Sequence, residues 1–265
     1  FLPGTGHEVV APERLRERFN IDVRTQSSVL SIDRSKKIVR VAELGSGREY
    51  EESYDKLILA PGAAPLRPPI PGIDQPGIFT LRNLADVDRI KGAIDEGVKR
   101  AVIVGAGFIG LELAENFIHR GVQTTVVELQ DQVLPPLDKE MTTPILQALS
   151  AHGVAVVLGQ SATAFEPAES GLNVLLKSGE VIPADLVILG VGVRPENTLA
   201  VEAGLEVGPR GGIQVNEQLQ TSDPDIYAVG DAIETRDFVT GGPTQVPLAG
   251  PANRQGRIAA DNVFG

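Results

Sequence analysis

The chain contains no cysteine and no tryptophan, and only three of its residues are histidine. Without cysteine, these 265 residues can form no disulfide, no thiolate metal site and no thiol nucleophile. The three histidines, His7, His119 and His152, do not have the spacing of metal ligands. Because His119 and His152 lie near the predicted ends of two helices, we interpret them as partners of the helix dipole and expect no metal site.

Long apolar runs and an excess of basic residues are also missing. No apolar run approaches the roughly 20 residues that span a bilayer, and no basic-then-apolar signal sequence occurs. Lys and Arg total 24 against 35 Asp and Glu, so the net charge is −11. Such a surface repels phosphate backbones and anionic lipids. We therefore expect a soluble cytoplasmic protein that binds neither nucleic acid nor membrane.

The first hundred residues read as strands and turns followed by one helix. Alternating apolar residues predict short strands at 29–32 and 38–41, separated by a polar turn. Residues 54–60 predict a buried strand that ends in a glycine turn at Pro61-Gly62. The proline-rich residues 65–72 predict an extended connector. Residues 84–96 predict a helix that carries Val87, Ile90 and Ile94 on one face.

The middle of the chain alternates strands and helices. Apolar runs at 101–104, 124–128, 154–158 and 185–190 predict buried strands, and helical spacing is found at 109–120 and 138–152. The order β-α-β-α-β indicates an α/β fold, a parallel sheet with helices on both faces. Residues 162–182 look like a small insertion of antiparallel strands. Beyond Gly212 we expect a short buried strand at 225–231 and the start of a helix at 251–262.

A glycine motif, Gly105-Ala-Gly-Phe-Ile-Gly110, joins the first of these strands to the first helix. In a Rossmann-type βαβ unit the first glycine permits the tight turn, the second lets backbone approach a pyrophosphate, and the third lets helix and strand pack closely. The following helix directs its free N–H groups and positive dipole end at the phosphates. The motif therefore predicts dinucleotide binding; a close-packed glycine turn without a ligand is the alternative.

A carboxylate, Glu128, closes the second strand 23 residues after Gly105, near the offset of about 20 expected for the ribose-binding acid. A carboxylate accepts hydrogen bonds from ribose hydroxyls and repels a 2′-phosphate. The following residues, Leu129-Gln-Asp131, add negative charge rather than a phosphate-binding Arg or Lys. The sequence thus favours NADH over NADPH, with a solvated surface acid as the alternative.

Several segments of the chain resemble the pyridine nucleotide–disulfide oxidoreductases, FAD-dependent enzymes with two nested dinucleotide-binding domains. The resemblance extends from about His7 over nearly the whole chain, and Pro247-Leu-Ala-Gly-Pro-Ala-Asn-Arg-Gln-Gly-Arg257 looks most like the coenzyme A-disulfide reductase, persulfide reductase and NADH oxidase/peroxidase branch. The other matching segments are Leu59-Ala-Pro-Gly-Ala63, Gly105-Ala-Gly-Phe-Ile-Gly-Leu-Glu-Leu-Ala114, Gly190-Val-Gly-Val-Arg-Pro195 and Thr221-Ser-Asp-Pro-Asp-Ile-Tyr-Ala-Val-Gly-Asp231.

The resemblance implies roles for individual residues. Asp231 would hold the FAD ribityl chain, Leu248 and Ala249 would approach the flavin, and Phe108 would occupy the position of an aromatic gate over it. Ile109 and Glu112 would lie near the flavin and nicotinamide rings; packing of Phe108 and Ile109 in the core, and helix-dipole complementarity for Glu112, are the alternatives. The implied contacts to the FAD adenylate or pyrophosphate are Val29, Ala60, Gly62 and Arg82. The implied NAD(H) site comprises Gly105, Gly107, Phe108, Ile109, Gly110, Glu128, Gly192 and Val193.

Three features of the family are missing from these residues. The family begins with an FAD-binding GxGxxG motif and, in this branch, has one redox-active cysteine about forty residues in; a C-terminal dimerisation domain follows the FAD domain. We therefore interpret the chain as an internal fragment of a homodimeric protein. The expected domains are a trailing half of an FAD-binding domain at 7–97, an inserted Rossmann-like NAD(H)-binding domain at 98–215 and a returning FAD segment at 216–265.

The expected function is that of a flavin-dependent NADH oxidoreductase. Hydride would pass from NADH to FAD and then to a thiol, disulfide or persulfide of the coenzyme A type, or to oxygen. The thiol step cannot take place within these residues, which have no cysteine. The alternatives are a thiol-free NADH:ferredoxin or rubredoxin reductase and, for the chain as it stands, a nucleotide-binding module without catalysis.

Overall fold

The computed structural model describes residues 12–265, which form two compact units. The inserted unit is Ala63–Arg194, and the discontinuous unit combines residues 12–62 with Pro195–Gly265. These units are bounded differently from the expected domains: residues 63–97 pack with the NAD(H)-binding segment, and 195–215 pack with the segments assigned to FAD. His7 and residues 7–11 of the first expected domain lie outside the described residues.

The inserted unit is built on a parallel sheet of five strands in the order β6-β13-β7-β8-β9. The central strands are the apolar runs predicted from the sequence, and no residue of β13 is exposed by more than 3%. The short edge strand β6 was not predicted. The strands are β6 (Ile78–Phe79), β7 (Arg100–Val104), β8 (Gln123–Val127), β9 (Ala155–Val157) and β13 (Leu186–Leu189).

Three helices cover one face of this sheet: α2 (Leu84–Asp95), α3 (Phe108–His119) and α4 (Lys139–Ala151). Ile90 of α2 and Phe117 of α3 are buried against the sheet at 4% and 2% exposure. Val87 of α2, predicted on the same face as Ile90, is instead 43% exposed. The two predicted histidine positions are confirmed, since His119 ends α3 and His152 caps α4.

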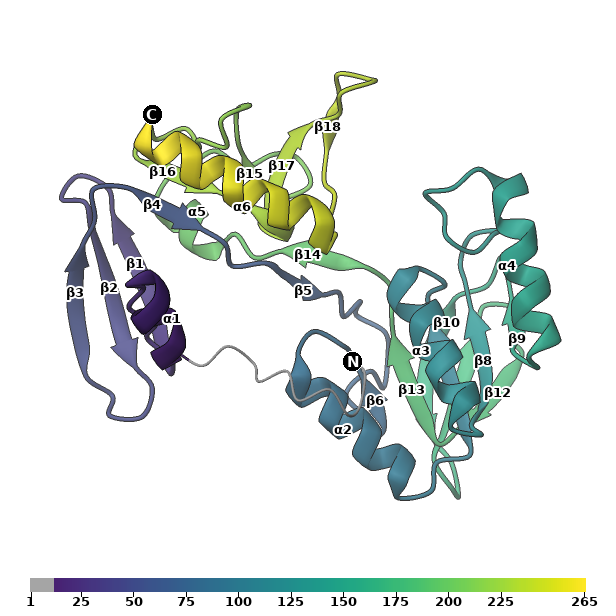
Figure 1. Cartoon of the computed structure of the whole chain (residues 1–265). Coiled ribbons are helices and arrows are strands. Elements are labelled where there is room, and N and C mark those ends of the chain that lie inside the picture. Colours follow the sequence, from purple (N-terminus) through teal and green to yellow (C-terminus); the bar gives the residue numbers. More distant parts are fainter. Residues whose placement is uncertain (1–11) are drawn as a thin grey trace. The chain divides into compact units, whose positions relative to one another are not determined.

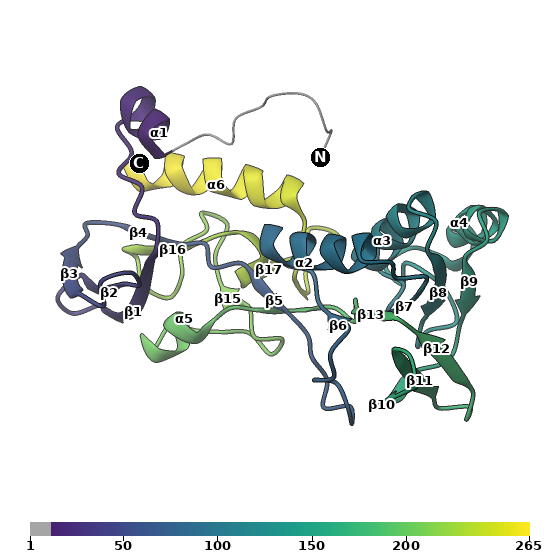
Figure 2. The same ribbon diagram turned by 90° about the horizontal axis from the view of Figure 1, so that it is seen from below.

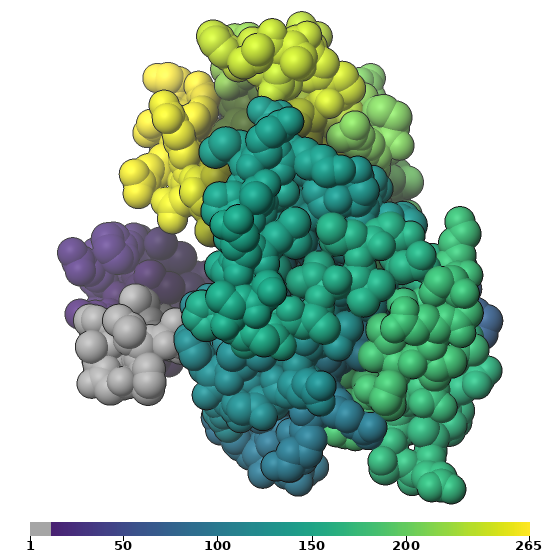
Figure 3. Space-filling model, turned by 90° about the vertical axis from the view of Figure 1, so that its right-hand side faces the viewer, coloured from purple at the N-terminus to yellow at the C-terminus, as the bar shows by residue number. Residues whose placement is uncertain are grey.

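The opposite face of the sheet is covered by an antiparallel sheet, β10 (Ala162–Pro167), β11 (Leu172–Leu176) and β12 (Val181–Ala184). Phe165 and Val174 pack there against Val102 and Val187 of the parallel sheet. The expectation of helices on both faces was therefore wrong, because the antiparallel insertion occupies the second face (Figure 2). Figure 3 looks onto this unit from the side on which α4 lies in Figure 1.

The discontinuous unit contains three small sheets. An antiparallel sheet combines β1 (Ser27–Asp33), β2 (Ile38–Glu43) and β3 (Glu49–Ser53); β4 (Leu57–Leu59) pairs in parallel with β16 (Ile226–Ala228); and β15 (Ile213–Gln214), β17 (Ile233–Arg236) and β18 (Pro243–Thr244) form the third. The strand predicted at 54–60 is shorter and less buried than expected, since it spans only β4 and leaves Ile58 42% exposed. The helices are α1 (Pro12–Phe19), α5 (Thr198–Glu202), the 3-10 turn η1 (Gly230–Ala232) and α6 (Ala249–Phe264).

Where the chain passes between the two units, β5 (Ala63–Pro65) pairs with β14 (Val193–Pro195). Neither strand was predicted from the sequence, because each has only three residues and Pro65 and Pro195 interrupt the pattern. Among residues 12–265, no helix has the length and apolar character needed to cross a membrane.

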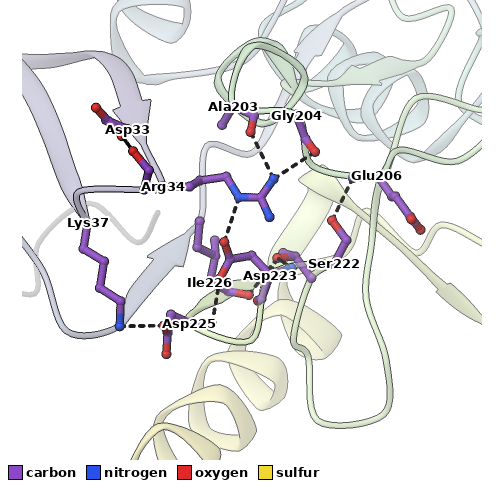
Figure 4. Close-up of polar contacts among 12 residues, drawn as sticks. Asp33, Arg34, Lys37, Ala203, Gly204, Glu206, Ser222, Asp223, Asp225 and Ile226 are labelled. Carbon is purple, nitrogen blue, oxygen red and sulfur yellow. Dashed lines mark hydrogen bonds and ion pairs between the residues drawn. The ribbon is translucent and has the colours of Figure 1, made fainter.

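An arginine ties the β1–β2 turn of the discontinuous unit to the segments that return after residue 195 (Figure 4). Arg34 Nε donates to Asp223 Oδ2 at 2.7 Å, and its Nη1 donates to the carbonyls of Ala203 and Gly204 at 3.3 and 3.1 Å. Burial opposes ionisation of Asp223, but Arg34 and a backbone N–H outweigh it and lower the pKa of this carboxyl. These contacts hold together segments 189 residues apart in the sequence.

Candidate functional site

The site is built where the parallel strands of the inserted unit end. The carboxyl ends of β7 and β13 converge so closely that a Cβ atom on Gly105 would lie 2.3 Å from the carbonyl oxygen of Gly190. Gly105 also has φ +110°, a conformation that L side chains avoid. Its backbone N–H donates to the Val127 carbonyl at 2.8 Å, which joins the turn to β8. Both constraints require glycine at this position.

The other two glycines of the motif meet different surroundings. A Cβ on Gly110 would lie 2.1 Å from the carbonyl oxygen of Gly105, so helix α3 packs directly on the turn. A Cβ on Gly107 would meet nothing within 4 Å. Gly107 caps the N-terminus of α3 in an extended conformation and, as a glycine, has no side chain that could bond to this end of the helix. The helix start is thus open to a ligand that accepts hydrogen bonds.

Glu128 lies beside the same turn rather than in solvent. It is 8% exposed, its Oε2 accepts from Ala106 N–H at 2.7 Å, and its Oε1 accepts from Gln130 N–H at 2.9 Å. The solvated-acid alternative was therefore wrong. Since carboxylate oxygens have further lone pairs, Glu128 can still accept hydrogen bonds from a ligand. The acid fixes the glycine turn and presents a negative charge to the space next to it.

A cavity of about 780 Å³ opens in front of the turn, large enough for a nucleotide ligand. The glycine turn, the end of β8, the loop after β9, the end of β13 and the proline-rich connector all contribute to its wall. Its lining includes Gly105, Gly107, Glu128, Gly190 and Gly192. An open glycine turn, an exposed helix start and a nearby acid match the chemistry of a dinucleotide, so the residues present fit NAD(H).

The residues that the resemblance places near the reactive rings are exposed. Phe108 is 49% exposed and Ile109 is 37% exposed, so the alternative that both pack in the core was wrong. Glu112 is exposed one turn further along α3, outside the first turn where an acid complements the dipole. Gly192 has φ +110° and lines the cavity, whereas Val193 follows it as the first residue of β14.

The residues expected to contact FAD are divided between the units: Arg82 belongs to the inserted unit and the rest to the discontinuous unit. Val29 and Ala60 line a cavity of about 250 Å³, whose wall is apolar except for Glu196 and whose volume is below that usual for such ligands. Gly62 has φ +75°, and Asp231 lies in η1. Leu248 caps α6, and Ala249 begins it. This cavity by itself is too small to enclose a whole FAD molecule.

The cavity-wall residues that were not predicted from the sequence include Arg67, Gln160 and Ser161. Gln160 and Ser161 follow β9 in the loop at the carboxyl end of the sheet, where ligands of α/β proteins bind. The topology could therefore have indicated them. Arg67 lies in the proline-rich connector, which the sequence identifies only as extended. Within residues 12–265 no cluster of three metal-ligating side chains is found.

Comparison with known proteins identifies the family. The family model described as pyridine nucleotide-disulphide oxidoreductase matches residues 4–256. The chain belongs to this family. It is 39% identical over 256 residues to an NADH oxidase of Methanocaldococcus jannaschii, covering 96% of this chain and 56% of that protein. It is 34% identical over 258 residues to a coenzyme A disulfide reductase of Staphylococcus aureus, covering 97% of this chain and 57% of the relative.

Solved structures agree with this assignment. A reduced Bacillus anthracis protein described as CoADR-RHD superposes with a TM-score of 0.92 at 48% identity, over 96% of this chain and 45% of its own. A water-forming NADH oxidase from Lactobacillus brevis bound to NADH gives 0.88 at 33% identity, over 95% and 55%. An engineered NADPH oxidase derived from it gives 0.89 at 31% identity, over 96% and 56%.

The expected family, the Rossmann-like fold class and the cofactor classes of the family are thereby confirmed. One neighbour, from Desulfovibrio vulgaris, is described as FAD-dependent; it is 38% identical, with a TM-score of 0.83, over 92% of this chain and 62% of its own. The chain spans 56–57% of the length of the curated relatives named above.

Proposed function

We propose that this chain carries the NADH-binding site of a flavin-dependent NADH oxidoreductase. The observation that carries the proposal is the buried Glu128 carboxylate, bonded to the glycine turn at 2.7 Å and lining the cavity in front of it. Gly107 and the start of α3 receive the pyrophosphate, and Glu128 accepts hydrogen bonds from the adenosine ribose. Gly105, Gly110 and Gly192 give the backbone the close approaches that this arrangement needs.

Preference for NADH over NADPH follows from the charge of the cavity. A 2′-phosphate on the ribose would meet the Glu128 carboxylate, and Leu129 and Gln130 offer it no positive charge. The engineered NADPH oxidase supports this assignment. Among the residues substituted in that enzyme are a Gly, an Asp 18 residues after it and a Pro seven residues after the Asp. Gly110, Glu128 and Pro135 of this chain have the same spacing (128 − 110 = 18; 135 − 128 = 7).

The intact protein would use the hydride of NADH to reduce FAD, which supplies the redox chemistry when bound. Phe108 and Ile109, half exposed at the start of α3, border the approach to the nicotinamide, and Glu112 follows them on the helix. The FAD contacts proposed by resemblance are Val29, Ala60, Gly62, Arg82, Asp231, Leu248 and Ala249.

The electron acceptor we propose is a thiol, disulfide or persulfide of the coenzyme A type, or oxygen, in a cytoplasmic homodimer. Relatives named as a coenzyme A disulfide reductase and an NADH oxidase support these two acceptor classes. A thiol step requires a cysteine from outside these residues, which hold none. A thiol-free NADH:ferredoxin reductase is the second candidate, favoured by a ferredoxin reductase of Rhodopseudomonas palustris among the similar structures, at 31% identity and a TM-score of 0.87 over 96% of this chain and 61% of its own.

Substitutions at the ribose end of the cavity test the proposal. Glu128→Arg should weaken NADH binding and reduce the difference in affinity between NADH and NADPH. Both affinities are measured by fluorescence titration. Because Glu128 also holds the glycine turn, Leu129→Arg is the cleaner variant: Leu129 is 61% exposed, so an arginine adds charge without removing a buried contact. An unchanged NADH/NADPH ratio in both variants would reject the ribose role of this corner.

The absorption spectrum of the purified chain separates the catalytic and binding-only alternatives. A flavin spectrum retained after gel filtration would show that these residues hold FAD and would argue against a nucleotide-binding module alone. A colourless protein that binds NADH would support the module without catalysis.

A further inference from the structure

The cofactor cavity has an uneven charge distribution. Among the described residues that line it, Glu128 is the only acid and Arg67 is the only base. Arg67 belongs to the proline-rich connector, which forms the wall together with Leu66 and Ile70. The proposed role of Glu128 explains the acid, but no part of the proposed function uses the base.

The backbone that carries Arg67 is fixed at both ends. Leu66 N–H donates to the Gly192 carbonyl at 2.9 Å, and Phe165 N–H donates to the Pro71 carbonyl at 2.9 Å. Gly72 approaches Phe165 so closely that a Cβ there would lie 1.8 Å from its carbonyl oxygen. Prolines between these anchors restrict the remaining dihedral angles. The connector therefore places the Cα of Arg67 at a defined point beside the cavity.

The side chain of Arg67, in contrast, is held only at the surface. Its Nη2 donates to the Asp74 carboxylate at 2.8 Å and to the Ile73 carbonyl at 2.9 Å. The side chains of Arg67 and Asp74 are 40% and 90% exposed. Ion pairs as exposed as this one contribute little to the stability of the folded state. Within residues 12–265, Nε and Nη1 of Arg67 donate no hydrogen bond. Breaking the ion pair with Asp74 therefore costs little free energy, and the guanidinium can bind another anion instead.

A dinucleotide brings its pyrophosphate, with two negative charges, to a protein whose net charge is −11. The N-terminus of α3 supplies only the equivalent of about half a positive charge. A guanidinium matches the geometry of phosphate oxygens and forms paired, charge-assisted hydrogen bonds with them. We propose that Arg67 is the anion-binding residue of this site and contacts a phosphate group of the bound dinucleotide, exchanging Asp74 for it. The inference rests on the proposed function, since it requires that the cavity bind a dinucleotide.

The test compares Arg67→Gln with the wild-type chain in titrations of NADH and NADPH at low and high salt. Loss of a charge-assisted hydrogen bond should weaken NADH binding about tenfold at low salt and reduce the salt dependence of binding. Arg120→Gln is the matched control: Arg120 belongs to the same unit and pairs with Asp95 at the surface, so this variant loses the same charge away from the cavity. NADH affinity should be unchanged in the control.

The two cofactors identify which phosphate Arg67 contacts. Equal losses for NADH and NADPH place Arg67 at the pyrophosphate that the two cofactors share. A loss confined to NADPH would place it at the 2′-phosphate, which NADH lacks, and would contradict the expected NADH contact. If Arg67→Gln binds both cofactors as tightly as the wild type, the inference is overturned while the proposed function stands. If the wild type binds neither cofactor, the proposed function itself fails. Asp74→Asn should bind NADH at least as tightly as the wild type, because it releases the guanidinium; weaker binding in that variant would contradict the exchange.

Discussion

Gly105 and Gly97 offer a matched pair for testing how the glycine turn is built. Both have nearly the same strained backbone, with φ +110° and +111°. A Cβ on Gly97 would meet nothing within 4 Å, whereas a Cβ on Gly105 would lie 2.3 Å from the Gly190 carbonyl oxygen and 2.6 Å from its carbon. Alanine at Gly97 therefore adds only backbone strain, and alanine at Gly105 adds the same strain and a steric overlap with a second strand.

The expected free energies differ accordingly. Backbone strain at positive φ costs about 1–2 kcal/mol for a residue with a Cβ. Overpacking against rigid backbone adds about 1–3 kcal/mol. Gly97→Ala should thus lower the free energy of unfolding by about 1 kcal/mol, and Gly105→Ala by about 3 to 4 kcal/mol, as measured by urea unfolding. Only Gly105→Ala should also impair NADH binding. Equal destabilisation of the two variants would refute the close approach of β7 and β13.

Two further predictions concern carboxylates of the inserted unit. Glu128→Gln should lower the free energy of unfolding by about 2 kcal/mol. The carboxamide oxygen can accept a hydrogen bond from the N–H of either Ala106 or Gln130, but the NH₂ group then faces the remaining N–H, which loses its acceptor. Glu166 is exposed, so the control variant Glu166→Gln should leave the free energy of unfolding in urea unchanged. Arg100 bonds to Asp185 at 2.5 Å and, against the opposing effect of burial, keeps the pKa of Asp185 below its ordinary 3.8. The stabilisation from this pair is therefore complete above pH 3.8 and is lost as the pH falls through the lower folded-state pKa. Asp185→Asn should cost about 1–2 kcal/mol at pH 7, discounted for partial exposure, and progressively less at lower pH; an equal loss at pH 7 and at pH 2 would contradict the ion pair.

The parts of the fold that were predicted correctly depend on periodic apolar sequence. The runs at 101–104 and 185–190 are central strands, and the helix after Gly107 begins and ends within a residue of its predicted bounds. Three glycines and one acid at fixed offsets predict the candidate site, because their spacing reflects local backbone geometry. These features are encoded by residues close together in the sequence.

Features that depend on distant parts of the chain were predicted less well. The antiparallel segment at 162–182 was predicted, but no local pattern indicates that β10–β12 cover the second face of the parallel sheet in place of helices. The burial of Glu128 depends on its bonds to Ala106 and Gln130, and a carboxylate at the end of a strand looks the same in the sequence whether buried or solvated. Arg67 reaches the cavity because Leu66 bonds to Gly192, a contact 126 residues along the chain (192 − 66 = 126).

Titration of the wild-type chain with NADH, followed by competition with NADPH, tests the central claim most directly. An acid at the ribose end of a cavity with no nearby cation except Arg67 predicts saturable NADH binding that is at least about tenfold tighter than NADPH binding. Saturable binding that favours NADPH, or no binding of either cofactor by the folded protein, would contradict the assignment of this cavity as an NADH site.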